Sequence, residues 1–449
     1  MSCRIELEKR FSGRLSVDPK LGRQIVSYQG NKGLPGLRWM KYKEGFSKAL
    51  VERFVKEKSP SDLLDPFSGL GTAPLVASGQ GVNATGIEIM PVGVLAAMGI
   101  AHAANGLDKE EFHAVGGDLL HRVSCRKKAG SSYRFPHVGI TDKAFPEKTE
   151  EHIAKAREFI DQVDDSPMRD MLNLACMSIL ESVSFTRKDG QYLRWDYRSG
   201  RPLRSHVDLG EIQDFEGALE NRLREMEDDI DEVKDAFGNR YPRLLNGSCL
   251  ELLRALPDVS IDLIVTSPPY ANRYDYTRTY ALELAWLGLD KAGFSDLRQK
   301  MLTATVENKS KLEWLDSLYE DGLDSAKAMY DAQGTLNEIV GILNDNRENL
   351  SNKNIIRLIQ GYFFEMAVVV SEMGRILRPG GGVIMVNDNV QYHGEEIPVD
   401  FILSDFAEKS GMACKNIWAL PRGKGNSSQQ MAIYGRREIR KCVYEWEKE

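Results

Sequence analysis

A short stretch in the middle of the chain combines groups that could bind and orient a planar ligand. Residues 263–266 are apolar or β-branched and predict a buried strand, and the strand is followed at once by Ser267-Pro268-Pro269-Tyr270. Because a proline has no backbone N–H, the strand must stop there and leave carbonyl oxygens, a hydroxyl and an aromatic ring at its carboxyl end. In open α/β sheets, ligands bind at that edge. The stretch therefore predicts a site for a planar, amine-bearing ligand; the alternative is a proline turn between two elements.

A second stretch predicts a strand, a glycine turn and a helix, and it reads Asp65-Pro66-Phe67-Ser68-Gly69-Leu70-Gly71-Thr72. Gly69 and Gly71 allow the backbone to turn tightly and approach a ligand, at which the next helix would direct its N-terminal N–H groups. The following strand ends in Glu88, at the spacing where a carboxylate meets ribose hydroxyls in Rossmann-like units. The third glycine of the dinucleotide fingerprint is missing, which disfavours a dinucleotide. The alternative is a βαβ unit without a ligand.

Cations and aromatic rings alternate over residues 184–204, which predicts a β-hairpin. Cations beside aromatic rings in an acidic protein suit a phosphate backbone and unstacked bases. The alternative is a solvated hairpin held by cation–π contacts. A polar glycine loop at 421–430 forms a second local basic cluster with the residues after it. The candidate nucleic-acid contacts are Arg187, Lys188, Tyr192, Arg194, Trp195, Arg198, Arg273, Arg422 and Lys424.

The charge balance limits where a nucleic acid could bind. The chain has 59 Lys and Arg against 66 Asp and Glu, a net charge of −7 at pH 7, so any such site must be a local patch. Its six cysteines are scattered without a CxxC pair, which argues against a zinc ribbon or a disulfide scaffold and suits a reducing cytoplasm. No signal sequence or membrane span is recognisable, and we expect a cytoplasmic protein with no metal and no membrane partner.

Together, the two strand-end motifs resemble those of the S-adenosylmethionine-dependent amino-methyltransferases of DNA, and the Ser-Pro-Pro-Tyr form is similar to the N4-cytosine branch. The resemblance covers about half of the chain, residues 24–118, 243–290 and 360–441. It implies S-adenosylmethionine as cofactor, with the 65–72 turn around its methionine part and Glu88 on its ribose. Residues 43–47 resemble, less closely, the motif that closes over the methionine end, and Phe46 and Ser47 are its candidate cofactor contacts. Ser248 stands where many relatives carry an acid near the adenine.

The length of 449 residues exceeds one ordinary core. We predict an α/β fold, a Rossmann-like methyltransferase sheet with helices on both faces, interrupted by two largely helical insertions. The predicted parts are an N-terminal and cofactor-binding half (1–118), an insertion that is the candidate target-recognition region (119–242), a catalytic half (243–292), a helical insertion (293–359) and the C-terminal part of the sheet with a basic tail (360–449).

The chemistry of the proline motif follows from the nature of an exocyclic aryl amine, whose lone pair is delocalised into the ring. Ser267 and the carbonyl of Pro268 would accept its N–H bonds, and Tyr270 would stack on a base swung out of the duplex. In-line transfer then needs positioning and no covalent intermediate. A cytosine-C5 enzyme would instead need a nucleophilic cysteine, usually after a proline, and none of the 17 prolines precedes a cysteine.

The sequence thus predicts a site-specific DNA methyltransferase that acts on cytosine N4, in restriction–modification or phage defence. The implied partners are double-stranded DNA and a cognate restriction endonuclease or defence-system subunits. Three alternatives stay open: an adenine-N6 DNA methyltransferase, an RNA guanine-N2 methyltransferase, and a non-catalytic nucleic-acid-binding subunit. No pattern in the chain specifies the recognised base sequence or the oligomeric state.

Overall fold

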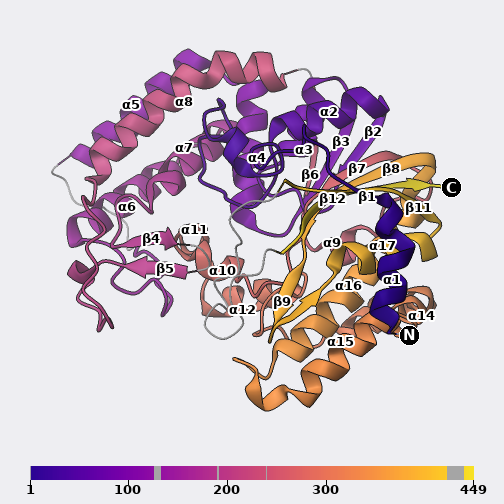
Figure 1. The fold of residues 1–449 in the computed structure, drawn as a ribbon. Coiled ribbons are helices and arrows are strands. Elements are labelled where there is room, and N and C mark those ends of the chain that lie inside the picture. Colours follow the sequence, from indigo (N-terminus) through magenta and orange to yellow (C-terminus); the bar gives the residue numbers. More distant parts are fainter. Residues whose placement is uncertain (1, 126–132, 190–191, 239, 422–438) are drawn as a thin grey trace.

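A mixed sheet of eight strands forms the centre of the protein (Figure 1). The computed structural model describes residues 2–125, 133–189, 192–238, 240–421 and 439–449. Across the sheet the strands follow in the order β1 (Leu15–Ser16), β11 (Met412–Ala419), β12 (Lys441–Lys448), β8 (Leu377–Asp388), β7 (Ile261–Thr266), β2 (Asp62–Asp65), β3 (Asn83–Glu88) and β6 (Arg243–Asn246). Strands β8, β7, β2, β3 and β6 are parallel, so their carboxyl ends meet at one edge. The predicted α/β class is confirmed.

Alternation along the strands places apolar side chains on both faces of the sheet. Leu63 and Leu263 belong to one core, whereas Leu64 and Ile264 belong to the other. The first core is completed by α2 (Lys48–Lys58), α3 (Thr72–Gly79) and α4 (Pro91–Ala104). The second is completed by α1 (Cys3–Phe11), α9 (Cys249–Leu252), α16 (Ile355–Ile376) and α17 (Val399–Lys409). Helices therefore cover both faces, as predicted.

The connection from β3 to β6 carries the first group of extra elements. It contains α5 (Lys109–Ser124), α6 (Glu147–Ile160), α7 (Ser166–Ile179) and α8 (Phe215–Phe237), together with the hairpin β4 (Thr186–Asp189) and β5 (Tyr192–Trp195). Asp165 and Asp214 begin α7 and α8 by accepting hydrogen bonds from the backbone N–H of Met168 and Gly217. In Figure 1 these helices form an arm beside the sheet, with the hairpin at its lower end.

The connection from β7 to β8 carries the second group, which is helical as predicted. Before α16 it holds α10 (Tyr276–Thr279), α11 (Ala281–Trp286), α12 (Lys291–Lys300), α13 (Leu312–Tyr319), α14 (Asp324–Asp331) and α15 (Gly334–Asp345). After β8, a small hairpin of β9 (Val390–Tyr392) and β10 (Glu395–Ile397) extends the same edge. No helix of the described ranges is long and apolar enough to cross a membrane.

The Arg-Pro-Gly-Gly-Gly sequence at residues 378–382 is typical of a tight turn before a strand, but these residues lie within the long strand β8. The irregularity instead appears as a register shift against β7 between Ile261 and Leu263, and Gly380 takes a φ of 79°. Glycine tolerates this left-handed conformation, so the strand continues through it.

Candidate active site

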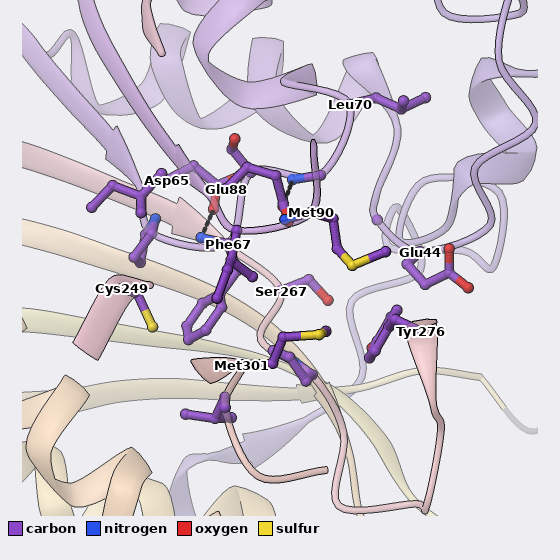
Figure 2. A pocket seen from close by; sticks show the side chains of 18 of the residues that line it. Glu44, Asp65, Phe67, Leu70, Glu88, Met90, Cys249, Ser267, Tyr276 and Met301 are labelled. Atoms are coloured by element: carbon purple, nitrogen blue, oxygen red, sulfur yellow. Dashed lines mark hydrogen bonds between the residues drawn. The ribbon is translucent and has the colours of Figure 1, made fainter. Parts of the chain in front are cut away.

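The carboxyl edge of the sheet surrounds a pocket that is open to solvent at its mouth (Figure 2). Four neighbouring strand ends contribute to it: Asp65 ends β2, Glu88 ends β3, Ser248 follows β6 and Ser267 follows β7. The two predicted motifs lie far apart in sequence and meet here because β2 and β7 are adjacent parallel strands.

The glycine turn is held by the acid that ends the next strand. Glu88 accepts a hydrogen bond from the backbone N–H of Gly69 (2.6 Å) and another from that of Met90 (2.7 Å). Gly69 and Gly71 take φ values of 54° and 76°, which favour glycine. Helix α4 approaches so closely that a Cβ on Gly93 would lie 2.4 Å from the carbonyl oxygen of Gly69. The carboxylate of Glu88 therefore has a fixed position on the pocket wall.

Asp65 fastens the two motif-bearing strands to each other. Its Oδ1 accepts a hydrogen bond from the hydroxyl of Thr266, the last residue of β7, at 2.7 Å, and one from the backbone N–H of Phe67 at 3.0 Å. Thr266 is fully buried and directly precedes Ser267. This bond sets the distance between the glycine turn and the proline motif.

Burial raises the pKa of both acids to about 7. For Asp65, the hydrogen bonds from Thr266 and Phe67 lower the pKa but do not offset desolvation. For Glu88, the bonds from Met90 and Gly69 do the same, and the nearby charge of Asp65 raises the pKa further. Both carboxyl groups are thus poised to change charge near neutral pH when a charged ligand arrives.

Ser267 and Pro269 of the proline motif line the pocket. In Figure 2 the Ser267 hydroxyl points toward the end of the pocket where Tyr276 and Glu44 lie. Pro268 and Tyr270 are not part of the pocket wall. Burial raises the pKa of Tyr270, although a hydrogen bond with the Ser267 side chain acts in the opposite direction. The loop thus directs its serine to the pocket and keeps its tyrosine beside that serine.

The wall opposite the motifs comes from the second long connection, through Met301 and Leu302. The next residue, Thr303, donates its backbone N–H and its hydroxyl to the two carboxylate oxygens of Glu365 on α16, at 2.7 and 2.6 Å. Lys311 contacts the same carboxylate at 2.8 and 2.9 Å, and both side chains are buried. This buried ion pair anchors the segment that closes the pocket.

Most of the predicted cofactor residues line the pocket. Besides Asp65, Gly69, Glu88 and Ser248 they are Phe46, Pro66, Phe67, Ser68 and Thr72. Gly71 and Ser47 do not. A Cβ on Gly71 would lie 2.8 Å from Cβ of Ala97, which indicates a packing role, and the Ser47 hydroxyl donates to the carbonyl of Ile25. The Ser248 hydroxyl donates to the carbonyl of Lys300 at 2.8 Å, so it ties β6 to the opposite wall.

Glu44 lies within the predicted motif at residues 43–47 and lines the pocket. Several other wall residues were not anticipated from the sequence, namely Tyr42, Met90, Cys249, Tyr276, Met301 and Leu302. Tyr42 directly precedes the motif at 43–47, and Tyr276 lies in the aromatic run after the proline motif, so nearness to a motif was the available signal. Met301 and Leu302 have no such neighbour. They lie in an insertion whose position depends on tertiary contacts.

The β4–β5 hairpin has an inner and an outer face. Opposite residues of an antiparallel pair share a face, and the register pairs Arg187 with Arg194 and Lys188 with Leu193. Lys188 points inward, is buried and forms an ion pair with Glu283 at 2.5 Å. Its prediction as a DNA contact is therefore wrong, since no phosphate can reach a buried, paired ammonium. Trp195 is on the same inner face, with the guanidinium of Arg201 4.1 Å from its ring centroid.

The other predicted arginines of residues 184–204 differ in how many hydrogen bonds and ion pairs they already form. Arg187 donates to backbone carbonyls of Glu181, Ser184, Thr186 and Glu211. The Arg198 guanidinium pairs with the buried Asp196 and holds the pKa of that carboxyl well below its usual range. Arg194 is 55% exposed, with only a 3.5 Å contact to Asp189. Arg194 is thus the cation of this hairpin with the greatest freedom to meet a ligand.

The remaining predicted contacts have different outcomes. Arg273 follows the proline motif, is partly exposed and donates to the Ser351 hydroxyl at 3.2 Å. Tyr192 begins β5, but its side chain lies outside the described part. Arg422 and Lys424 also lie outside the described residues. All four residues remain predictions as DNA contacts.

The pocket fits a cationic nucleoside cofactor. Glu88 can accept ribose hydroxyls, while Phe67 and Leu302 provide apolar surface for a base. Among the described lining residues there are three acids, Glu44, Asp65 and Glu88, and no Lys or Arg. A sulfonium and an ammonium group would be favoured in such surroundings. Fold and site together define a Rossmann-like S-adenosylmethionine-dependent methyltransferase.

Comparison with known proteins gives the family. The chain is 40% identical over 459 aligned residues to the Type II methyltransferase M.AvaI of Nostoc sp. and, equally, of Anabaena variabilis, with 98% of this chain and 92% of each relative covered. It is 37% identical to the Type II methyltransferase M.BsoBI of Geobacillus stearothermophilus, covering 99% and 92%. No protein-family profile matches the chain. The chain belongs to the Type II methyltransferases, the site-specific DNA methyltransferases of restriction–modification systems, and its methyl donor is S-adenosylmethionine.

Proposed function

We propose that the protein methylates the exocyclic N4 amine of cytosine in double-stranded DNA. The observation that carries the proposal is the position of Ser267, which follows β7 and lines the cofactor pocket at the start of a Ser-Pro-Pro-Tyr loop. A serine hydroxyl there can accept a hydrogen bond from an aryl amine without adding a charge. The Thr266–Asp65 bond holds it in register with the glycine turn.

S-adenosylmethionine supplies a methyl group already activated by its positive sulfur. The chain's own residues position the amine. The Ser267 oxygen and the Pro268 carbonyl accept its two N–H bonds, which directs the nitrogen lone pair toward the pocket and away from the ring. Pro269 keeps the loop rigid because it fixes its own φ and offers no N–H. Tyr270, adjacent to Ser267, stacks on the flipped base.

We place the duplex against the outer face of the β4–β5 hairpin and the loop after the proline motif. Arg194 is largely exposed there, and Arg273 lies three residues beyond Tyr270. Arg422 and Lys424 are further candidates. The protein as a whole is acidic, so these local cations would supply the electrostatic attraction.

The test is to incubate the protein with methyl-labelled S-adenosylmethionine and unmethylated DNA, and to resolve the product nucleosides by mass spectrometry. We expect N4-methylcytosine. Label found only in N6-methyladenine would sink the base assignment, and label only in RNA would sink the substrate class. DNA modified in this way should also resist the cognate endonuclease that we infer as partner; unchanged cutting would contradict that partnership.

A further inference from the structure

Lys188 contacts three separate parts of the protein from the inner face of the hairpin. Its ammonium pairs with Glu283 on α11 and lies 4.2 Å from the ring centroid of Tyr280. Its backbone carbonyl accepts a hydrogen bond from the Lys43 ammonium at 2.9 Å, and its backbone N–H donates to Glu181 at 2.9 Å. One residue of β4 therefore fixes the hairpin to the catalytic half and to the segment that precedes Phe46.

Tyr280 continues this chain of contacts to the cofactor pocket. Its hydroxyl donates to Glu44 at 2.5 Å, and its ring stacks on Tyr42 with centroids 4.8 Å apart and planes 19° apart. Tyr42 and Glu44 both line the pocket. Two side chains, Lys188 and Tyr280, therefore connect the hairpin to the pocket wall.

Filling this space with a buried ion pair carries an energetic cost. Lys188 and Glu283 have side chains that are each 2% exposed, and Oε2 of Glu283 is buried without a hydrogen-bond partner among the described residues. Removing two charges from water is costly, and apolar residues of similar volume often serve stability equally well. What an ion pair adds is a defined relative position for the two elements that carry it.

We propose that Lys188 is a positioning residue that couples DNA contact on the outer face of the β4–β5 hairpin to the cofactor-pocket wall formed by Tyr42 and Glu44. The proposal rests on the proposed placement of DNA against this hairpin. A duplex bound to the outer face of the hairpin restrains Lys188 on its inner face, and through Tyr280 it restrains the wall around the cofactor. Cofactor and DNA therefore bind more tightly together than separately, and by the same factor in either order.

The experiment measures the dissociation constant of S-adenosylhomocysteine, which cannot donate a methyl group. It is measured with and without an unmethylated duplex that the wild-type protein methylates. The variants are Tyr280→Phe, which removes only the hydroxyl that holds Glu44, and Lys188→Met with Glu283→Gln, which removes the ion pair without leaving an unpaired charge. Lys148→Met is the matched control, because it removes a lysine from an exposed ion pair with Asp214 in the same connection.

We expect the duplex to tighten cofactor binding by about fivefold or more in the wild type and in the control. In both test variants, the ratio of the dissociation constant without the duplex to that with the duplex should fall to within about twofold of one. A purely structural role would change stability or both affinities and leave the ratio as it is. The coupling is overturned if the ratio is one in the wild-type protein. It is also overturned if Tyr280→Phe has the same ratio as the wild type, even if the double variant does not fold.

This outcome is separable from that of the proposed function. The ratio does not depend on which base receives the methyl group, so N6-methyladenine as product would leave the coupling standing. An unchanged ratio together with N4-methylcytosine would overturn the coupling alone. Loss of the Arg194 contribution to DNA binding, measured separately, tests the placement of the duplex.

Discussion

The carboxyl edge of the sheet and the β4–β5 hairpin were both predicted from local sequence, and they differ in how closely the structure agrees with the prediction. At the carboxyl edge, Asp65, Glu88 and Ser267 line one pocket. In the hairpin, Lys188 is buried in an ion pair, and Arg187 and Arg198 are bonded to their own surroundings. Of the hairpin's predicted cations, Arg194 remains the most exposed.

The difference has a physical origin. A strand end in a parallel sheet has a fixed place, so a residue that follows a buried strand is delivered to the carboxyl edge whatever surrounds it. A hairpin only fixes which residues share a face, and the fold decides which face is buried. The sequence therefore predicted where the site lies better than whether each charged side chain is buried, paired or exposed.

Replacing the motif serine should have the largest effect. Ser267→Ala removes the hydroxyl that accepts the amine N–H, and kcat should fall on the order of 10²–10³-fold. S-adenosylhomocysteine should bind nearly as in the wild type, because Ser267 is one of many wall residues. Ser260→Ala, in the turn before the amino end of β7, is the control and should keep kcat. Normal methylation by Ser267→Ala combined with Tyr270→Ala would refute the catalytic assignment.

A glycine that no motif indicated should be the next most sensitive position. In Gly93→Ala, the new Cβ would meet the Gly69 carbonyl and approach Cγ of Glu88 at 3.1 Å, so α4 must move. We expect a loss of about 1–3 kcal/mol in the free energy of unfolding and weaker cofactor binding. Chemical denaturation and titration calorimetry measure the two effects.

The control is Gly117→Ala in α5, where an added Cβ meets nothing within 4 Å. That change should leave cofactor binding alone and stabilise the helix slightly. Equal behaviour of the two variants would show that the close approach of α4 does not support the pocket.

Cofactor binding should depend on pH through Asp65 and Glu88, whose pKa values are raised to about 7. A cationic ligand favours their charged forms, so binding releases protons and the dissociation constant falls as pH rises from 6 to 8, by about tenfold or less. In Glu88→Gln this dependence should be weaker. A flat profile in the wild type would contradict it.

The same pKa shifts act on the ligand-free protein in the opposite sense. An acid whose pKa is raised in the folded state holds its proton more firmly there than in the unfolded chain. Its contribution to the free energy of unfolding is complete below about pH 4 and is lost as pH rises through 7. Urea denaturation of the cofactor-free protein at pH 5 and pH 8 should show this loss, and S-adenosylmethionine should reduce it.

The smallest predicted effect separates Arg194 of the hairpin from Arg198 of the 3-10 turn that follows it. Arg194→Ala should weaken DNA binding and reduce its dependence on salt by about one counterion, because Arg194 is free to contact a phosphate. Arg198→Ala should leave the salt slope unchanged. It should lower the free energy of unfolding, since it leaves the buried carboxylate of Asp196 without its charge partner. Equal slopes for Arg194→Ala and the wild type would move the DNA surface elsewhere.

The sheet and the motif residues that line the pocket could be predicted because they depend on local patterns. Buried strands, the glycine turn at Gly69 and the acid at Glu88 each have a signature of a few residues. Strands β2, β3 and β7 lie where the two strand-end motifs predicted strands.

Met301, Leu302 and the inward orientation of Lys188 could not be predicted in the same way. Their positions depend on buried partners in distant elements. Glu365 holds Thr303, the residue after Met301 and Leu302, and Glu283 holds Lys188. A buried ion pair leaves no periodic trace in the sequence, because each partner alone is indistinguishable from a surface charge. Side chains that close a site from an insertion are therefore the part that sequence reasoning misses.

The segment that closes the pocket has a consequence for synthesis of the protein. The wall extends from Tyr42 to Leu302, and Thr303 is anchored only when Glu365 is in place. A growing chain on the ribosome therefore contains the glycine turn and the proline motif long before it can enclose a cofactor. Methylating activity should appear only after α16 has emerged and folded, so fragments released earlier would remain inert toward DNA.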